Sequence, residues 1–216
     1  MVTRSLAIAL PLVMELACLG ASSTSASTSE KTTMNPDISM TTRVARDGDQ
    51  LLVGYEVYNR SSHDIYLLNR LYRSSPAWRM DPSVVYVRLD KPTATVMLAK
   101  RTPDLPEGVS VTAPFSPFVT PVRASQTFRE TIALPLPLAT YEQYARKHPQ
   151  PRNTKATYRH VNFTLGYYIA PEGTTEEERD VQGSKVIIPK IPAGRRPEFS
   201  GLTSAVFDVA VPVLED

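Results

Sequence analysis

Cysteine, glycine and histidine are scarce in this sequence, and each scarcity removes a class of protein. The only cysteine is Cys18, so no intramolecular disulfide can hold the fold together. The 9 glycines form no phosphate-binding loop, and no Gly-x-Ser-x-Gly motif marks a serine hydrolase. The 3 histidines, His63, His148 and His160, stand at no metal-ligand spacing. The sequence therefore predicts no catalytic residue, no metal site and no cofactor.

Charge of one sign is also lacking, because 24 Lys plus Arg face 22 Asp plus Glu, for a net charge of +2. A nucleic-acid-binding protein normally carries a larger basic excess, so we expect no nucleic-acid partner. The 216 residues correspond to one ordinary domain once a leader and a tether are set aside. Proline is abundant, with 19 residues, which favours many connections and strand ends over helices.

Long apolar runs are absent, and the best one is typical of a secretory leader. Arg4 precedes Leu6–Val13, a stretch too short to span a bilayer. Residues 1–21 are therefore predicted to direct export, to the periplasm if the producer is bacterial. Leu16-Ala17-Cys18 resembles the end of a bacterial lipoprotein leader, whose cysteine becomes the lipidated first residue, although Glu15 departs from that pattern.

Lipidation of Cys18 would anchor the protein to a membrane, and no other membrane contact is expected. Residues 22–36 are rich in Ser and Thr and are predicted to be a disordered tether. The alternative is ordinary cleavage after Ala21 or Ala26, which would release a soluble exported protein. Residues 37–216 are assigned to the folded domain.

Alternation of apolar and polar residues is the main structural signal in that domain. Leu51, Val53, Tyr55 and Val57 fall on one face of an extended strand, and the next apolar run, Asp64–Asn69, is predicted to fold back on it as a hairpin. Further strands are predicted over Ile38–Arg46, Ser83–Leu89, Thr93–Ala99, Gln126–Leu134, Tyr158–Ile169, Lys185–Ile188 and Ser204–Val211. Residues 172–183 are polar and are interpreted as a loop.

One short helix is predicted around 140–147, because Thr140 and Gln143 have the spacing of a capping box and Tyr141 and Tyr144 recur at helical spacing. Together these elements predict an all-β fold, an antiparallel β-sandwich of 7–9 strands. Their order resembles an immunoglobulin-like sandwich, and with the leader the chain resembles uncharacterised bacterial envelope proteins that carry such a domain. The chain lacks the cysteine pair of antibody domains, and the resemblance implies no functional residue.

Basic and aromatic residues gather in two predicted connections, at 69–82 and 139–157. With a short strand over Val109–Thr112, the strand directions place both connections at one end of the sandwich, where they would suit an anionic polymer or an acidic protein surface. The alternative is that the rings pack on the core and the charges are merely solvated. The predicted binding residues, called the basic-aromatic set below, are Arg70, Tyr72, Arg73, Trp78, Arg79, Arg146, Lys147, Arg152 and Lys155.

These observations favour a non-enzymatic, exported binding module of the cell envelope with an unidentified partner. Two alternatives stay open. One is an inhibitor of exported proteases that presents the proline-braced segment Pro114–Phe118 to a target cleft. The other is a hydrolase with an unrecognised site, which His63, next to Asp64, or His160 would serve. Oligomeric state is not predicted.

Overall fold

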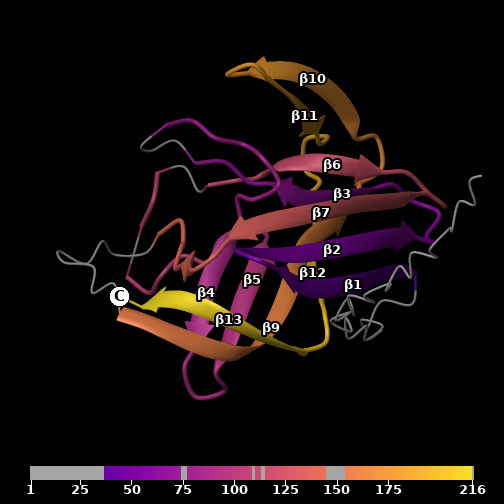
Figure 1. The fold of residues 1–216 in the computed structure, drawn as a ribbon. Coiled ribbons are helices and arrows are strands. Elements are labelled where there is room, and N and C mark those ends of the chain that lie inside the picture. Colours follow the sequence, from indigo (N-terminus) through magenta and orange to yellow (C-terminus); the bar gives the residue numbers. More distant parts are fainter. Residues whose placement is uncertain (1–36, 74–76, 109, 113–114, 145–153, 216) are drawn as a thin grey trace, which may run out of the picture.

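The computed structural model describes residues 37–73, 77–108, 110–112, 115–144 and 154–215, and its regular elements are β-strands (Figure 1). Within these ranges 13 strands form two sheets, one antiparallel and one mixed. No helix in this part of the chain is long and apolar enough to cross a membrane. The predictions of an all-β fold and of two sheets are confirmed.

The smaller sheet has the order β1-β2-β7 and is antiparallel throughout. Its strands are β1 (Ile38–Asp47), β2 (Gln50–Asn59) and β7 (Thr127–Pro135). Val53 and Tyr55 on β2 are buried, as the alternation predicts, and Gly48 makes the turn from β1 to β2 with φ 56. A positive φ costs glycine little, which suits it to that hairpin turn.

The larger sheet has ten strands arranged around the long central strand β9. Its strands are β3 (Ile65–Arg70), β4 (Tyr86–Asp90), β5 (Thr95–Lys100), β6 (Phe118–Val122), β8 (Leu138–Ala139), β9 (Thr154–Ile169), β10 (Thr175–Val181), β11 (Ser184–Lys190), β12 (Phe199–Thr203) and β13 (Phe207–Glu215). One edge of β9 pairs with β5 and then β3, and the other with β13 and then β12. The prediction of a purely antiparallel sandwich is wrong, since β5 runs parallel to β9 and β8 parallel to β13.

The core lies between the two sheets, where the inward side chains of both interdigitate. Tyr55 of the small sheet contacts Phe163 of β9 with ring centroids 5.0 Å apart, and both side chains are buried. Figure 1 shows β1, β2 and β7 running across the direction of β4 and β5 of the larger sheet. The β10–β11 hairpin projects from the body, and a single residue pair, Ile187 with Val119, joins it to β6 (Figure 1).

The predicted hairpin between Leu51–Asn59 and Asp64–Asn69 is wrong, because β2 and β3 belong to different sheets. The chain crosses between the layers at Asn59, whose side chain is buried. Its Nδ2 donates hydrogen bonds to the carbonyls of His63 (2.8 Å) and Val122 (3.0 Å). Backbone carbonyls that leave the regular pairing of a sheet need other hydrogen-bond donors when they are buried. The Asn59 amide is such a donor at this crossing.

The predicted helix around 140–147 is wrong for the residues described there, of which none is helical. Tyr141 and Val87 exchange both backbone hydrogen bonds, at 2.8 and 3.0 Å, and so extend the edge of β4. An isolated helical turn is marginal in water, and two bridge bonds with a Tyr86–Tyr141 ring contact at 5.8 Å outweigh it. Residues 145–147 lie outside the described ranges.

Two further expectations are corrected. The predicted loop at 172–183 contains strand β10, and the count of 7–9 strands is too low because β6, β8, β10 and β12 lack a clean apolar alternation. The described residues within Val109–Thr112 form no strand.

Candidate functional site

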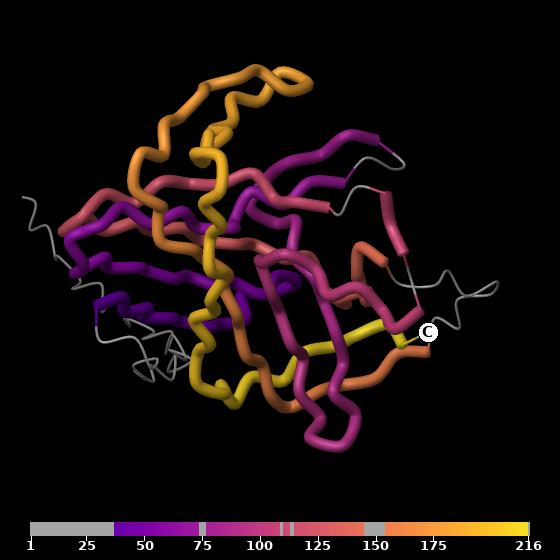
Figure 2. Tube along the Cα trace, turned by 180° about the vertical axis from the view of Figure 1, so that it is seen from behind, coloured from indigo at the N-terminus to yellow at the C-terminus, as the bar shows by residue number. Residues whose placement is uncertain are grey.

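A groove of about 500 Å³ lies on the outer face of the larger sheet, on the side away from β1, β2 and β7. Its floor is formed by β4, β5, β9 and β12, which lie side by side in that order. Figure 2 shows the β4–β5 hairpin and β12 on either side of β9. Residues 101–106 and 142–144 form its walls. Pockets of about 300–1,000 Å³ hold small ligands or short peptide segments.

Small residues on three neighbouring strands form the floor of the groove and give it depth. Ala99 of β5, Gly166 of β9 and Gly201 of β12 all line the groove, and Gly166 and Gly201 are directly paired. A Cβ on Gly201 would find Thr164 Cγ2 at 3.7 Å as its nearest neighbour, which is ordinary van der Waals contact. A Cβ on Gly166 would lie 2.7 Å from Arg101 Cβ, because the chain leaving β5 crosses directly over it. Gly166 therefore lets the wall at 101–106 sit against the sheet.

Apolar and aromatic side chains give the groove its lining. Met97 and Phe199 are 38 % and 58 % exposed, which is unusual for large apolar residues on a packed sheet. Tyr86 and Tyr144 stand on the opposite side, and the hydroxyl of Tyr144 accepts a hydrogen bond from the Phe115 amide at 2.6 Å. Exposed apolar side chains in a concave site are typical of a surface that a partner covers.

Two ion pairs stand on the rim. Arg88 Nε lies 2.6 Å from Glu142 Oε1, and Arg101 Nη1 donates to Asp104 Oδ1 at 2.9 Å. The hydrogen bonds from Arg101 lower the pKa of Asp104, and the same bonds raise the pKa of Arg101. The Asp104 carboxylate is therefore charged at neutral pH, and each ion pair lies on a wall segment of the groove. The groove thus offers an apolar floor with a balanced polar rim, an arrangement suited to recognition.

The basic-aromatic set is only partly brought together. Tyr72 and Trp78 stack with centroids 4.8 Å apart, and Arg73 lies 3.6 Å from the centre of the Tyr141 ring. Arg79 is paired with Asp81, which reduces the net positive charge of this region. Tyr72 also contacts Phe115 and Phe118, so these rings pack on the domain as well as facing solvent.

Two other members of the set lie on strands of the larger sheet. Arg70 is half-buried at the end of β3, and Lys155 is exposed near the start of β9, where it pairs in register with Leu214. Arg146, Lys147 and Arg152 lie outside the described residues, as does the predicted lipidation site Cys18. The binding role of the set stays a prediction.

The segment proposed for protease inhibition begins outside the described ranges, at Pro114. Phe115 and Pro117 are buried, and Phe115 packs in a cluster with Leu71, Val84 and Tyr86. An inhibitory loop has to present side chains to a cleft, so in this conformation the two buried residues are occupied by the protein's own core.

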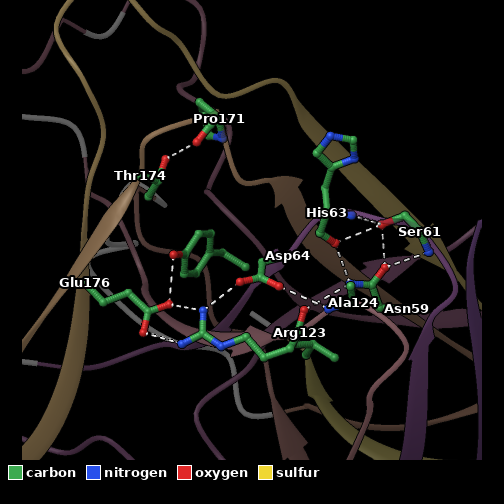
Figure 3. Close-up of polar contacts among 11 residues, drawn as sticks. Asn59, Ser61, His63, Asp64, Arg123, Ala124, Pro171, Thr174 and Glu176 are labelled. Atoms are coloured by element: carbon green, nitrogen blue, oxygen red, sulfur yellow. Dashed lines mark hydrogen bonds and ion pairs between the residues drawn. The ribbon is translucent and has the colours of Figure 1, made fainter.

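His63 and Asp64 lie beside a polar cluster that ties the β10–β11 hairpin to the body (Figure 3). Arg123 donates to Asp64 Oδ2 at 2.8 Å and to both carboxylate oxygens of Glu176 at 2.7 Å. The other Asp64 oxygen accepts from the Ala124 amide at 3.1 Å, and His63 Nδ1 faces Ser62 Oγ at 3.2 Å. Asp64 thus orients Arg123 and not His63, which argues against a Ser-His-Asp arrangement.

His160 lies on β9, with its Nδ1 2.9 Å from Asp208 Oδ1 on β13. The exposed Asp208 and the absence of a nearby nucleophile among its recorded contacts make this a cross-strand surface pair. No group of three or more metal-ligating side chains occurs among residues that the structure describes.

Sequence reasoning missed the groove because its residues come from segments spread between Leu68 and Gly201. One signal was available in Ala99 and Gly166, small residues inside predicted strands; glycine in a strand often marks a close backbone approach. Gly201 lies outside every predicted strand. The alignment of these three residues required the register of β5, β9 and β12. Comparisons of the chain with protein-family models, curated proteins and solved structures find no match.

Proposed function

We propose that this protein is an exported, non-enzymatic binding module of the cell envelope, built on an immunoglobulin-like β-sandwich. The two facing sheets support the sandwich, and the leader features around Leu6–Val13 support export. Its attachment is either a lipid on Cys18 or none, with the protein released after Ala21 or Ala26.

The observation that carries this proposal is the groove over β4, β5, β9 and β12. Exposed Met97 and Phe199 stand above a floor of small residues, and fixed ion pairs bound the opening. Leaving such apolar surface in water is unfavourable by about 25 cal/mol per Å², so a partner that covers it gains affinity. Glu142 and Asp104 in the groove lining are each paired with an arginine. Carboxylates held in this way are poorly suited to acid-base chemistry, which favours a binding role.

A second candidate is binding of an anionic envelope polymer at Tyr72, Arg73 and Trp78. The stacked rings and the Arg73 guanidinium on Tyr141 support it, since sugars and anions both favour such surfaces. Reversing Arg73 and Arg79 to Glu would abolish salt-sensitive binding to an anionic glycan if this surface is the site. Unchanged binding would remove this second candidate.

Site-specific photo-crosslinking tests the groove. A photoreactive amino acid at position 97 is expected to trap a discrete envelope partner in the producing cells. The same amino acid at Arg43, exposed on the outer face of β1, is the matched control. A discrete adduct at position 97 alone supports the proposal, while none, or equal adducts at both positions, contradicts it.

Mass spectrometry of the mature N-terminus tests export and anchoring. A diacylated Cys18 would establish the lipid anchor, and a terminus at Ser22 or Ser27 would establish soluble export. An uncleaved chain beginning at Met1 would contradict export through a cleaved leader.

A further inference from the structure

Strand β12 presents an open edge next to the groove. Among described residues it pairs only with β9, from Phe199 opposite Tyr168 to Thr203 opposite Thr164. Four of its five residues are exposed. A strand with one unpaired edge offers a row of N–H and C=O groups to an added strand.

The composition of β12 separates it from three other edge strands, β1, β7 and β10. β1 carries Arg43 and Arg46, β7 carries Arg129, and β10 carries Glu178 with Asp180. Charged side chains of this kind discourage unwanted strand pairing. β12 reads Phe-Ser-Gly-Leu-Thr and has no charged residue. Its edge therefore lacks the protection that the chain gives to these three strands.

Three β12 residues, Phe199, Ser200 and Gly201, also line the groove. In a strand added beside β12, alternate side chains would point to the face on which the groove lies. One of them would lie beside Gly201 on the floor of the groove, where a Cβ would make only ordinary contact with Thr164. From this juxtaposition the geometry points to an extended peptide segment of a partner protein as the occupant, paired with β12 and anchored by an apolar side chain in the groove.

Charge at the start of β12 selects among such peptides. Arg195 and Arg196 are exposed just before the strand, and no ion pair is recorded for either among the described residues, while Glu198 is the single acid beside them. A strand added antiparallel to β12 would end near these arginines. The expected segment therefore carries a carboxylate at the end that lies beside Arg195 and Arg196. This inference rests on the groove being the binding site of the proposed function.

Selection of a displayed random peptide library on the purified protein tests the inference. The expected result is a consensus with one apolar residue, alternating side-chain character on either side of it, and an acidic residue or carboxylate at the end that lies beside Arg195 and Arg196. Gly201→Val should raise the Kd of selected peptides by about tenfold or more by filling the floor, and so should Met97→Lys. Arg195→Glu with Arg196→Glu should weaken the same peptides, and Arg43→Glu should leave their binding unchanged. Circular dichroism and the thermal midpoint confirm that each variant is folded.

Backbone pairing has its own readout. N-methylation along a selected peptide should abolish binding at every second residue, where the N–H faces β12, and be tolerated between. Uniform tolerance, failure to select any peptide, or selected peptides that bind Gly201→Val equally well would overturn the inference. A position 97 adduct to a glycan or to a small molecule would also overturn it while leaving the groove's function intact. Absence of any adduct at position 97 defeats the proposed function itself.

Discussion

Lys100 on β5 and Glu130 on β7 form an ion pair across the interface between the two sheets, with Nζ 2.7 Å from Oε2. The Lys100 side chain is 0 % exposed and that of Glu130 is 9 % exposed. Tyr55 donates its hydroxyl to the same Glu130 oxygen at 2.6 Å. Burial lowers the pKa of Lys100, and Glu130 opposes that effect. This pair explains why an acid interrupts the apolar face of β7.

Removing one partner of this pair should destabilise the fold. Lys100→Met leaves the Glu130 carboxylate buried with only the Tyr55 hydroxyl near it, and losses of about 3–5 kcal/mol are typical for an uncompensated buried charge. The double variant Lys100→Met with Glu130→Gln should recover part of the loss. Urea unfolding measures both, and Arg129→Met on the exposed face of β7 is the control expected to change nothing. Equal stability of Lys100→Met and the parent protein would contradict the assigned role.

Gly166→Ala should destabilise the protein while Gly201→Ala should not. A Cβ at position 166 would meet Arg101 Cβ at 2.7 Å and Leu68 Cδ1 at 3.0 Å, whereas one at position 201 makes only ordinary contact. Forcing the crossing chain away costs about 1–3 kcal/mol by analogy with overpacked cores. Thermal unfolding of both variants measures the difference, and similar midpoints would show that the wall at 101–106 does not rest on Gly166.

The β10–β11 hairpin should loosen when Glu176 is neutralised. Hydrogen bonds from Arg123 lower the pKa of Glu176, so its contribution is present at neutral pH and is lost as the pH falls below 4.5 through the lower folded value. Glu176→Gln should therefore lower the thermal midpoint at pH 7, by roughly 2–4 °C for a contribution of about 1 kcal/mol after screening of this partly exposed group.

The same difference should shrink at lower pH, because the carboxyl of the parent protein then also becomes neutral. Glu178→Gln, on the same strand but directed at Lys185, is the matched control and should leave the attachment of the hairpin intact. A difference between the parent and Glu176→Gln that stays constant with pH would rule out this electrostatic attachment.

Asn59→Ala should weaken the crossing between the sheets. The change removes two donated bonds, to His63 and Val122. The His63 carbonyl still accepts from Ser61 Oγ at 2.9 Å, so the expected loss of about 1–3 kcal/mol comes from the buried bond to Val122. Ser62→Ala nearby, which loses only an exposed contact with His63, is the comparison. Chemical unfolding distinguishes them, and equal stability would mean that water replaces the Asn59 amide without cost.

Strand identity followed from the sequence wherever one face is buried. The alternation at Val53, Tyr55, Phe163 and Leu165 predicts their burial, and the structure confirms it. Sheet membership did not follow, because the same pattern fits β2 paired with β3 or split between layers. The Asn59 side chain distinguishes the two arrangements, because it bonds to the carbonyl of Val122, which is distant in the sequence.

Of the four strands that escaped prediction, β10 and β12 clearly lack the half-buried pattern. β10 projects from the body, so its polar residues are solvated on both faces, and β12 has a single buried residue, Leu202. The groove depends on β12 and on glycines that carry no apolar signal. Small residues form a groove floor only where neighbouring strands bring them side by side, so the register of the strands is needed to recognise it.

Hydrogen exchange of the protein with and without a peptide selected on it tests the central claim most directly. The account predicts slowed exchange at β12 and in the wall at 101–106, with the Tyr72–Trp78 region unchanged. Slowed exchange confined to the Tyr72–Trp78 region, or no change at β12, would contradict it.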